Sequence, residues 1–388
     1  MLSTISINNY RSVRDLCIPL EQLNLITGTN SSGKSNLYRA LRLLSETAQH
    51  GVVSSLAAEG GLGSAFWAGP ESFSQAMYTD EVPVQGVVSK KVKRVRLGFA
   101  TEHLSYAISL GLPIPSQSAF ALDPEIKHES IWYGEHYHPS ALIAERKGPL
   151  IRVKDASKWQ VISQHVHSSV SLFDQINNPA IAPDIFLLRE FIRSWRFYGH
   201  FRTDKDAPSR QPQIGTRTPV LHHEGDNLAA ALQTIREQGH DQMLDEAIAD
   251  AFPRTQLAIS RLDDDRFVIH FHQHGLLRPL SGAELSDGTL RFLLWIAALL
   301  SPSPPPLMVL NEPETSLHPD LLPALARLII RASKRTQVWV ISHSNELIAA
   351  LENMAPHSKI QLKKQFGETI ITSRNQLNKP FWSWPDKR

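Results

Sequence analysis

The feature that most constrains this chain is the pattern G-x-x-x-x-G-K-S at residues 28–35. An apolar stretch at residues 23–27 comes directly before it and predicts a short buried strand. After it, residues 35–50 carry Leu37, Ala40, Leu41 and Leu44, whose spacing predicts a helix with one apolar stripe. Because a strand, a glycine-rich turn and a helix occur in this order, we predict a phosphate-binding loop rather than an ordinary Gly/Ser turn.

The residue types of this loop suit phosphate chemistry. Glycines allow the backbone to curl until successive N–H groups point at phosphate oxygens, and the helix N-terminus adds the positive end of its dipole. Lys34 would bring a charge to the β- and γ-phosphates, and Ser35 a hydroxyl to Mg²⁺. The predicted nucleotide-binding residues are Gly28, Thr29, Asn30, Ser31, Ser32, Gly33, Lys34, Ser35 and Asn36.

Three further patterns follow near the other end of the chain. Residues 285–289, Leu-Ser-Asp-Gly-Thr, open a predicted helix that runs over 286–300. Two short apolar runs, 307–310 and 337–342, predict buried strands. The first run ends at Asn311 and Glu312, and the second at His343. Strands and helices therefore alternate at both ends of the chain, which predicts parallel pairing with an antiparallel insert between.

Taken together, these motifs resemble the ABC-type ATPase heads of the SMC/RecF/OLD-like class, among small stand-alone AAA-family ATPases. Residues 9–12, N-Y-R-S, resemble the N-F-R-S opening of that class. Residues 311–319, N-E-P-E-T-S-L-H-P, resemble its D-E-P-E-x-x-L-H-P segment. The resemblance covers residues 1–50 and 280–350 firmly. It implies an α/β P-loop NTPase fold: an ABC-type head with a mixed or parallel core sheet, an antiparallel β subdomain and an inserted α/β module.

The resemblance also implies how the chain is divided. We expect the head to occupy residues 1–350, with a P-loop lobe at 1–110, an inserted region at about 111–225 and a signature and Walker B lobe at about 226–350. Residues 351–388 would form a strand and tail. Two local predictions lie in the third lobe: a helix over 227–251 weakened at Gly239, and a hairpin of residues 256–262 and 266–272. The Q-loop glutamine cannot be placed.

Roles for the remaining motifs come from the same resemblance, which implies ATP and Mg²⁺ as cofactors. Glu312 would orient or deprotonate the water that attacks the γ-phosphate, and His343 would be the switch histidine. Ser35 and Asn311 would hold Mg²⁺, partly through water. The signature residues Ser286, Asp287 and Gly288 would contact the ATP of the opposite subunit, which implies a homodimer that forms on ATP binding.

One position departs from the family pattern, which has Asp where this chain has Asn311. An amide can accept a hydrogen bond but brings no negative charge to Mg²⁺. Slow hydrolysis is therefore expected. The alternative is a nucleotide-gated binding or regulatory module with negligible hydrolysis.

Charge and composition bear on partners. In 388 residues, Lys and Arg number 40 against 38 Asp and Glu, a net charge of +2 that excludes an extreme polyanion binder but not a local basic patch. Two basic tracts make DNA a candidate partner. The alternative to DNA contact is a structural role: a charged sheet edge for the first tract, and a helix and loop with core aromatics for the second. The first tract contains Lys90, Lys91, Lys93, Arg94 and Arg96, and the second Arg189, Arg193, Arg196, Arg202, Lys205, Arg210 and Arg217 interleaved with Phe191, Trp195, Phe197, Tyr198 and Phe201.

The remaining composition points to a cytoplasmic protein without a membrane segment. The single cysteine, Cys17, excludes an internal disulfide, and the longest apolar run, 292–300, is too short to span a bilayer. We therefore predict an ATP-hydrolysing, ATP-dimerising enzyme coupled to DNA or to a separate effector protein, in genome maintenance or phage defence. The motor of a membrane transporter is disfavoured by the N-Y-R-S opening.

Overall fold

A computed structural model describes residues 1–49, 51–70, 74–79, 81–83, 93–155, 158–176, 178–372 and 381–386. Two compact units make up the chain, and each is built from segments that are distant in sequence. Unit 1 contains residues 1–21, 28–195 and 360–388, and unit 2 contains residues 22–27 and 196–359.

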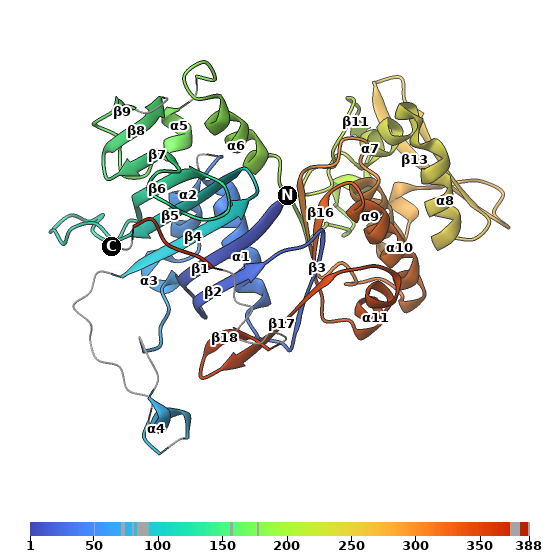
Figure 1. The fold of residues 1–388 in the computed structure, drawn as a ribbon. Helices are drawn as coiled ribbons and strands as arrows, with labels where there is room; N and C mark the ends of the chain where they lie inside the picture. The colour runs from blue at the N-terminus through green and yellow to red at the C-terminus, as the bar shows by residue number, and fades with distance from the viewer. Residues whose placement is uncertain are drawn as a thin grey trace. The chain divides into compact units, whose positions relative to one another are not determined.

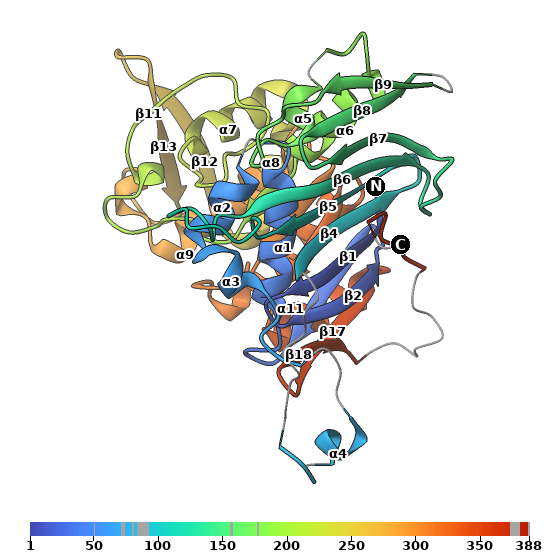
Figure 2. The ribbon, with the colours of Figure 1, turned by 90° about the vertical axis from the view of Figure 1, so that its left-hand side faces the viewer.

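An antiparallel sheet forms the body of unit 1, with strand order β2-β1-β4-β5-β6-β7-β8-β9 (Figure 2). The first two strands form a hairpin, in which Tyr10 pairs with Val13. The sheet continues through residues 94–163 and so includes part of the inserted region predicted at about 111–225. Its strands are β1 (Leu2–Tyr10), β2 (Val13–Pro19), β4 (Arg94–Thr101), β5 (Leu104–Gly111), β6 (Glu125–Tyr133), β7 (Leu142–Lys147), β8 (Leu150–Asp155) and β9 (Lys158–Ser163).

Helices complete unit 1. α1 (Lys34–Glu46) buries the predicted stripe of Leu37, Ala40, Leu41 and Leu44. The fully buried Glu129 of β6 accepts hydrogen bonds from Tyr106 of β5 and from Ser171 and Leu172, which begin α5 (Leu172–Gln175). The other elements are α2 (Val52–Ala58), α3 (Gly61–Ala65), α4 (Gln75–Tyr78), α6 (Pro183–Arg193) and the hairpin of β17 (Ser358–Gln365) with β18 (Glu368–Ile371).

Four parallel strands organise unit 2, and two of them, β3 and β16, are labelled in Figure 1. β10 (Arg196–Tyr198) pairs with β15 (Leu307–Asn311), which pairs with β16 (Gln337–Ile341), which pairs with β3 (Leu23–Gly28). Because both predicted apolar runs are strands of this sheet, their side chains lie in the core with those of α9 (Asp287–Leu299), which is buried on nearly all sides from Leu290 onward.

The rest of unit 2 surrounds that core. The predicted hairpin is present as β12 (Thr255–Arg261) and β13 (Arg266–Gln273). The prediction of one helix over 227–251 is wrong: α7 (Leu228–Ile235) and α8 (Asp241–Ala251) are separate, because Gln238 and Gly239 leave helical geometry and Gly239 takes φ 81°. The remaining strands and α-helices are β11 (Gln213–Ile214), β14 (Leu280–Ser281), α10 (Leu322–Ser333) and α11 (Asn345–Met354).

The architecture confirms the predicted fold class, an α/β P-loop fold with a parallel core sheet and antiparallel sheets. Among the described residues, no helix has both the length and the apolar character needed to cross a membrane.

Candidate functional site

The phosphate loop of unit 1 is held in a conformation that requires its glycines. Gly33 takes φ 108° just before α1, in the left-handed region that favours glycine. A Cβ at Gly33 would collide with Oγ1 of Thr369, and one at Gly28 would collide with the carbonyl oxygen of Leu362. The loop backbone is therefore packed against the β17–β18 hairpin, where no side chain fits.

Lys34 lies at the centre of this loop and is buried, with 7% of its surface exposed. Its Nζ donates to the carbonyl oxygens of Gly28 at 2.6 Å and Thr29 at 3.1 Å. The ammonium group is thus kept inside the curl of the loop. Thr29, Asn30, Ser31 and Ser35 are exposed. A glycine cradle closed to side chains, a central ammonium and an exposed hydroxyl fit a bound triphosphate.

A chain of hydrogen bonds connects the loop with the N-Y-R-S motif. Asn36 Nδ2 donates to Ser12 Oγ at 2.7 Å, and Ser12 Oγ lies 2.7 Å from Thr369 Oγ1. Thr369 Oγ1 also donates to the carbonyl oxygen of Ser32 at 3.1 Å. Ser12 therefore acts as a bridge between β1–β2 and the phosphate loop. Sequence reasoning missed Thr369, since no motif marks it and its contacts are with residues far away in the chain.

In unit 2 the strand ends carry the acidic segment. β15 and β16 are in register, with Asn311 opposite Ile341. Glu312 takes φ 50°, a left-handed conformation that is costly for a residue with a Cβ. Its N–H donates to the carbonyl oxygen of Ile341 at 2.7 Å, and its own carbonyl accepts from Thr315 N at 3.1 Å. These bonds retain the strained backbone and leave the Glu312 side chain 42% exposed.

Glu314 organises the segment that bears His343. Its Oε1 accepts from Ser342 Oγ at 2.7 Å, from His343 N at 3.0 Å and from Ser344 N at 3.1 Å. The His343 ring stands between two carboxylates, with Nδ1 3.6 Å from Glu312 Oε1 and 3.4 Å from Glu314 Oε1. The structure therefore brings the two predicted catalytic residues together. Glu314, to which the sequence interpretation assigned no role, is the buried acceptor that holds the His343 segment in place.

The signature lies at the N-terminus of α9. Ser286 is the N-cap, its hydroxyl accepting from Thr289 N at 3.2 Å. Asp287 is exposed, and a Cβ at Gly288 would lie 3.1 Å from the carbonyl oxygen of Ser316. Arg291 Nη1 donates to the carbonyl oxygen of Thr315 at 3.1 Å. The signature and the segment after Glu314 are thus adjacent within unit 2.

The turn that precedes the signature is capped separately. Glu284 accepts from Ser281 N at 3.0 Å and from Arg278 Nη2 at 2.6 Å. Hydrogen bonds from Arg278, followed by those from Ser281, lower the pKa of Glu284 to about 2. The capping carboxylate is therefore ionised at neutral pH.

The fourth strand adds residues that the sequence did not reveal. β10 ends at Tyr198, and a Cβ at Gly199 would lie 3.1 Å from Cβ of Asn311. The exposed His200 follows. Because carboxyl ends of parallel strands meet at one edge, the 199–200 segment belongs with Asn311. At three residues, β10 is too short to leave a periodic pattern in the sequence.

The basic tracts are largely occupied by internal contacts. Lys90 and Lys91 lie outside the described residues. Arg94 and Arg96 form ion pairs with Asp386, at 3.2 and 2.8 Å. In the second tract the aromatics favour the alternative interpretation: Trp195, Phe197, Tyr198 and Phe201 are buried in the core, and Phe191 is half-buried. Its cations include Arg193, Arg202, Arg210 and Arg217, each paired with an acidic residue.

Comparison with known proteins agrees with this geometry. Residues 23–349 match the family described as "AAA domain, putative AbiEii toxin, Type IV TA system", and the chain belongs to this family of P-loop ATPases. No curated protein is significantly similar in sequence.

Among solved structures, an Smc head bound to the C-winged helix domain of ScpA matches with a TM-score of 0.50 at 13% identity, over 97% of this chain and 98% of that one. This likeness confirms the SMC-head type of fold. An SMC head domain from Thermotoga maritima has a TM-score of 0.46 at 14% identity, over 96% of this chain and 99% of that one. An Smc head with an extended coiled coil, bound to the C-terminal domain of ScpA from Pyrococcus furiosus, has a TM-score of 0.48 at 12% identity, over 96% and 95%.

The role of Glu314 can be tested by stability alone. Glu314→Ala leaves the donors at 342–344 without their shared acceptor, so we expect unfolding free energy to fall by about 2 kcal/mol or more in urea titrations. Glu314→Gln keeps an oxygen acceptor and should recover most of that loss. Glu346→Ala is the control, because Glu346 is exposed and its carboxylate accepts hydrogen bonds from its own backbone N–H and from the Ser344 hydroxyl. Equal stability of Glu314→Ala and the control would contradict the anchor role.

Proposed function

We propose that this protein binds ATP with Mg²⁺ at the phosphate loop, pairs with a second copy on ATP binding, hydrolyses ATP slowly, and couples its nucleotide state to a partner. The observation that carries the proposal is the loop itself, a glycine cradle closed to side chains around a buried Lys34. The ordered signature, acidic and histidine motifs, together with family membership, support the same conclusion.

Each motif has a role in this proposal. The loop amides of residues 28–36 and Lys34 bind the phosphates, and Glu312 takes a proton from or orients the attacking water. His343 donates to the γ-phosphate. Ser286, Asp287 and Gly288 meet the ATP of the second copy through the hydroxyl and N–H groups at the start of α9. Mg²⁺, held by Ser35 and Asn311 partly through water, would neutralise charge that develops on the phosphates.

Nucleotide binding is the first step to test. Lys34→Ala removes the ammonium group that the loop encloses, so we expect ATP affinity to fall by at least a hundredfold in isothermal titration with Mg²⁺. Lys334→Ala, on the surface of unit 2, is a control that should bind as the wild type does. Tight ATP binding by Lys34→Ala would contradict the assignment of residues 28–35 as the phosphate loop.

Dimerisation and hydrolysis are tested together by Glu312→Gln. The amide keeps the size of the side chain but cannot accept a proton, so ATP should persist and the dimer should accumulate. We expect ATP turnover at least tenfold below wild type, and a mass near twice 43.5 kDa by light scattering with ATP and Mg²⁺. Wild-type turnover in this variant would remove Glu312 from the mechanism.

The second candidate, a nucleotide-gated module with negligible hydrolysis, is favoured by Asn311. An amide there provides no charge for Mg²⁺, whereas Asn311→Asp would restore one. We expect this substitution to raise turnover several-fold or to lower the Mg²⁺ concentration needed for half-maximal activity. If the wild type dimerises on ATP without turnover, and Asn311→Asp hydrolyses ATP, the protein is a nucleotide-gated module with negligible hydrolysis.

For the partner, the observations favour a separate effector protein over DNA. Arg94, Arg96 and Arg210, which were candidates for phosphate contact, are bound to acidic side chains of the same chain. The structurally similar Smc heads were solved with domains of a second protein, ScpA. The family description names a toxin–antitoxin system, which suits a defence role. Stimulation of ATPase activity by duplex DNA that disappears as salt is raised would favour DNA instead.

A further inference from the structure

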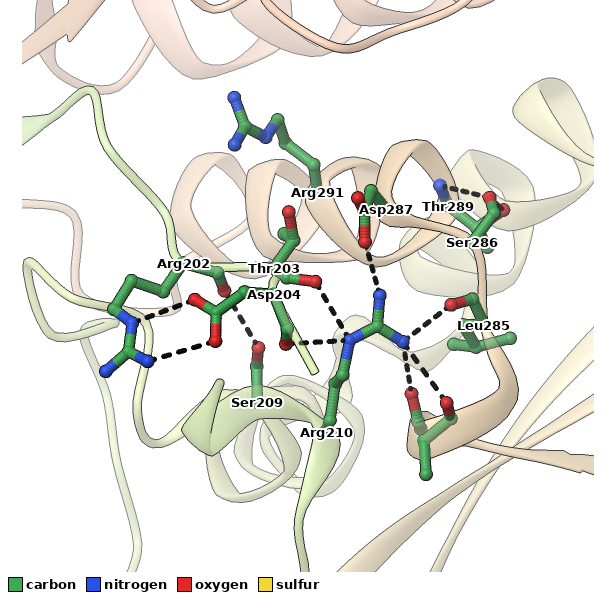
Figure 3. Close-up of polar contacts among 12 residues, drawn as sticks. Arg202, Thr203, Asp204, Ser209, Arg210, Leu285, Ser286, Asp287, Thr289 and Arg291 are labelled. Atoms are coloured by element: carbon green, nitrogen blue, oxygen red, sulfur yellow. Dashed lines mark hydrogen bonds and ion pairs between the residues drawn. The ribbon is translucent and has the colours of Figure 1, made fainter. Parts of the chain in front are cut away.

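Arg210, from the second basic tract, makes several hydrogen bonds beside the signature (Figure 3). Its side chain is only 8% exposed. Nη2 donates to Asp287 Oδ1 at 2.5 Å, and Nη1 donates to the carbonyl oxygen of Leu285 at 2.6 Å. Nη1 also lies 3.3 Å from the carbonyl oxygens of Gly282 and Ala283.

These contacts cover the turn that leads into α9. A guanidinium presents five N–H donors in a rigid plane, which a lysine cannot imitate. Here it binds three carbonyl oxygens of the 282–285 turn, those of Gly282, Ala283 and Leu285, and the first carboxylate of the helix. The direction of the first turn of α9 is therefore tied to one buried cation.

The charge of Arg210 also matters for the signature. Asp287 is 63% exposed at the start of α9, where it would repel a phosphate that approached the Ser286 hydroxyl and the helix amides. Arg210 pairs with this carboxylate and offsets its charge at the point where an anion would dock.

A single segment connects this contact to the end of β15. Residues 199–210 begin with Gly199 beside Asn311. Phe201 offers its carbonyl oxygen to Arg291 Nη2 at 3.0 Å. The carbonyl oxygens of Thr203 and Asp204 accept from Arg210 Nε at 2.9 and 3.1 Å. The segment that follows β10 thus reaches from the end of β15 to the start of α9.

We propose that Arg210 is a positioning residue for the signature: it orients and neutralises the start of α9 so that Ser286 and Gly288 can bind the triphosphate held by a second copy of this chain. This inference rests on the proposed function. It predicts that Arg210 acts on the opposite subunit's ATP, while ATP binding by its own phosphate loop is independent of it.

The local part of the proposal is tested without nucleotide by hydrogen–deuterium exchange of the purified full chain. In Arg210→Ala, amides of residues 282–290 should exchange at least tenfold faster than in wild type, and peptides covering residues 28–46 should be unchanged. Arg210→Lys, which keeps the charge, should fall between. Arg202→Ala is the matched control, since Arg202 lies in the same segment but is exposed and paired only with the nearby Asp204. Unaltered exchange at 282–290 in Arg210→Ala and Arg210→Lys would overturn the positioning role.

The effect on the opposite subunit is tested by mixing variants. Arg210→Ala alone should bind ATP within twofold of wild type but hydrolyse it at least tenfold more slowly, as should Lys34→Ala for lack of bound ATP. In a mixed dimer, the intact loop of the Arg210→Ala copy faces the intact signature of the Lys34→Ala copy. In an equal mixture that pairs at random, about half of the dimers are mixed, and each mixed dimer has one complete site out of two. With saturating ATP, the mixture should therefore recover up to about a quarter of wild-type activity.

Each outcome separates the two proposals. If wild type neither dimerises on ATP nor hydrolyses it, the proposed function fails, and exchange at 282–290 still decides whether Arg210 positions α9. If wild type is active and the mixture stays inactive, Arg210 acts within its own subunit and the inference is overturned. If Arg210→Ala does not fold, Arg210→Lys replaces it in both experiments, with a smaller expected loss.

Discussion

The parallel register of four strands in unit 2 is the constraint on which the rest of the site depends. β10, β15, β16 and β3 all run in one direction, so their carboxyl ends meet at one edge. Asn311 is opposite Ile341, which is opposite Ile26, and the chain passes from β3 into the phosphate loop at Gly28. Since β3, β15 and β16 are buried on both faces, a shift of one of them by one residue would exchange its side chains between the two covered faces and displace the residue that follows it.

In each unit the loops that follow the strands have no ladder of their own, and polar side chains from distant parts of the chain hold them in place. Thr369 binds the phosphate loop through Ser32 and the N-Y-R-S motif through Ser12. Glu314 accepts hydrogen bonds from residues 342–344, and Arg210 donates to the carbonyl oxygens before α9. In each case one nearly buried group bonds to two or more partners from other parts of the chain. Removing it would leave those partners without their protein hydrogen bond.

Much of this could be predicted from local patterns. The phosphate loop follows from its motif and the stripe of α1 from helical spacing. The hairpin β12–β13 follows from two strand-like runs around a turn, and the buried strands β15 and β16 from short apolar runs. The helix predicted over 227–251 is split in two, because residues 236–242 carry no apolar side chain to hold a continuous helix against the core, and Gln238 and Gly239 leave helical geometry. The arginines of the basic tracts were assigned by charge alone, and charge does not reveal whether an acidic partner such as Asp386 or Asp287 lies opposite.

By itself, the sequence determined the type of chemistry: a loop of glycines with one lysine, an acidic strand end, a histidine strand end and a helix that opens with Ser-Asp-Gly. These motifs depend on residue types at short spacing, and the local conformation of a single strand, loop or helix is enough to place such neighbours together. Only the tertiary structure decided which residues support them, because Thr369, Glu314, Gly199 and Arg210 act through contacts with groups distant in the chain. Such contacts form when strands pair and helices pack, and no spacing along the chain records them.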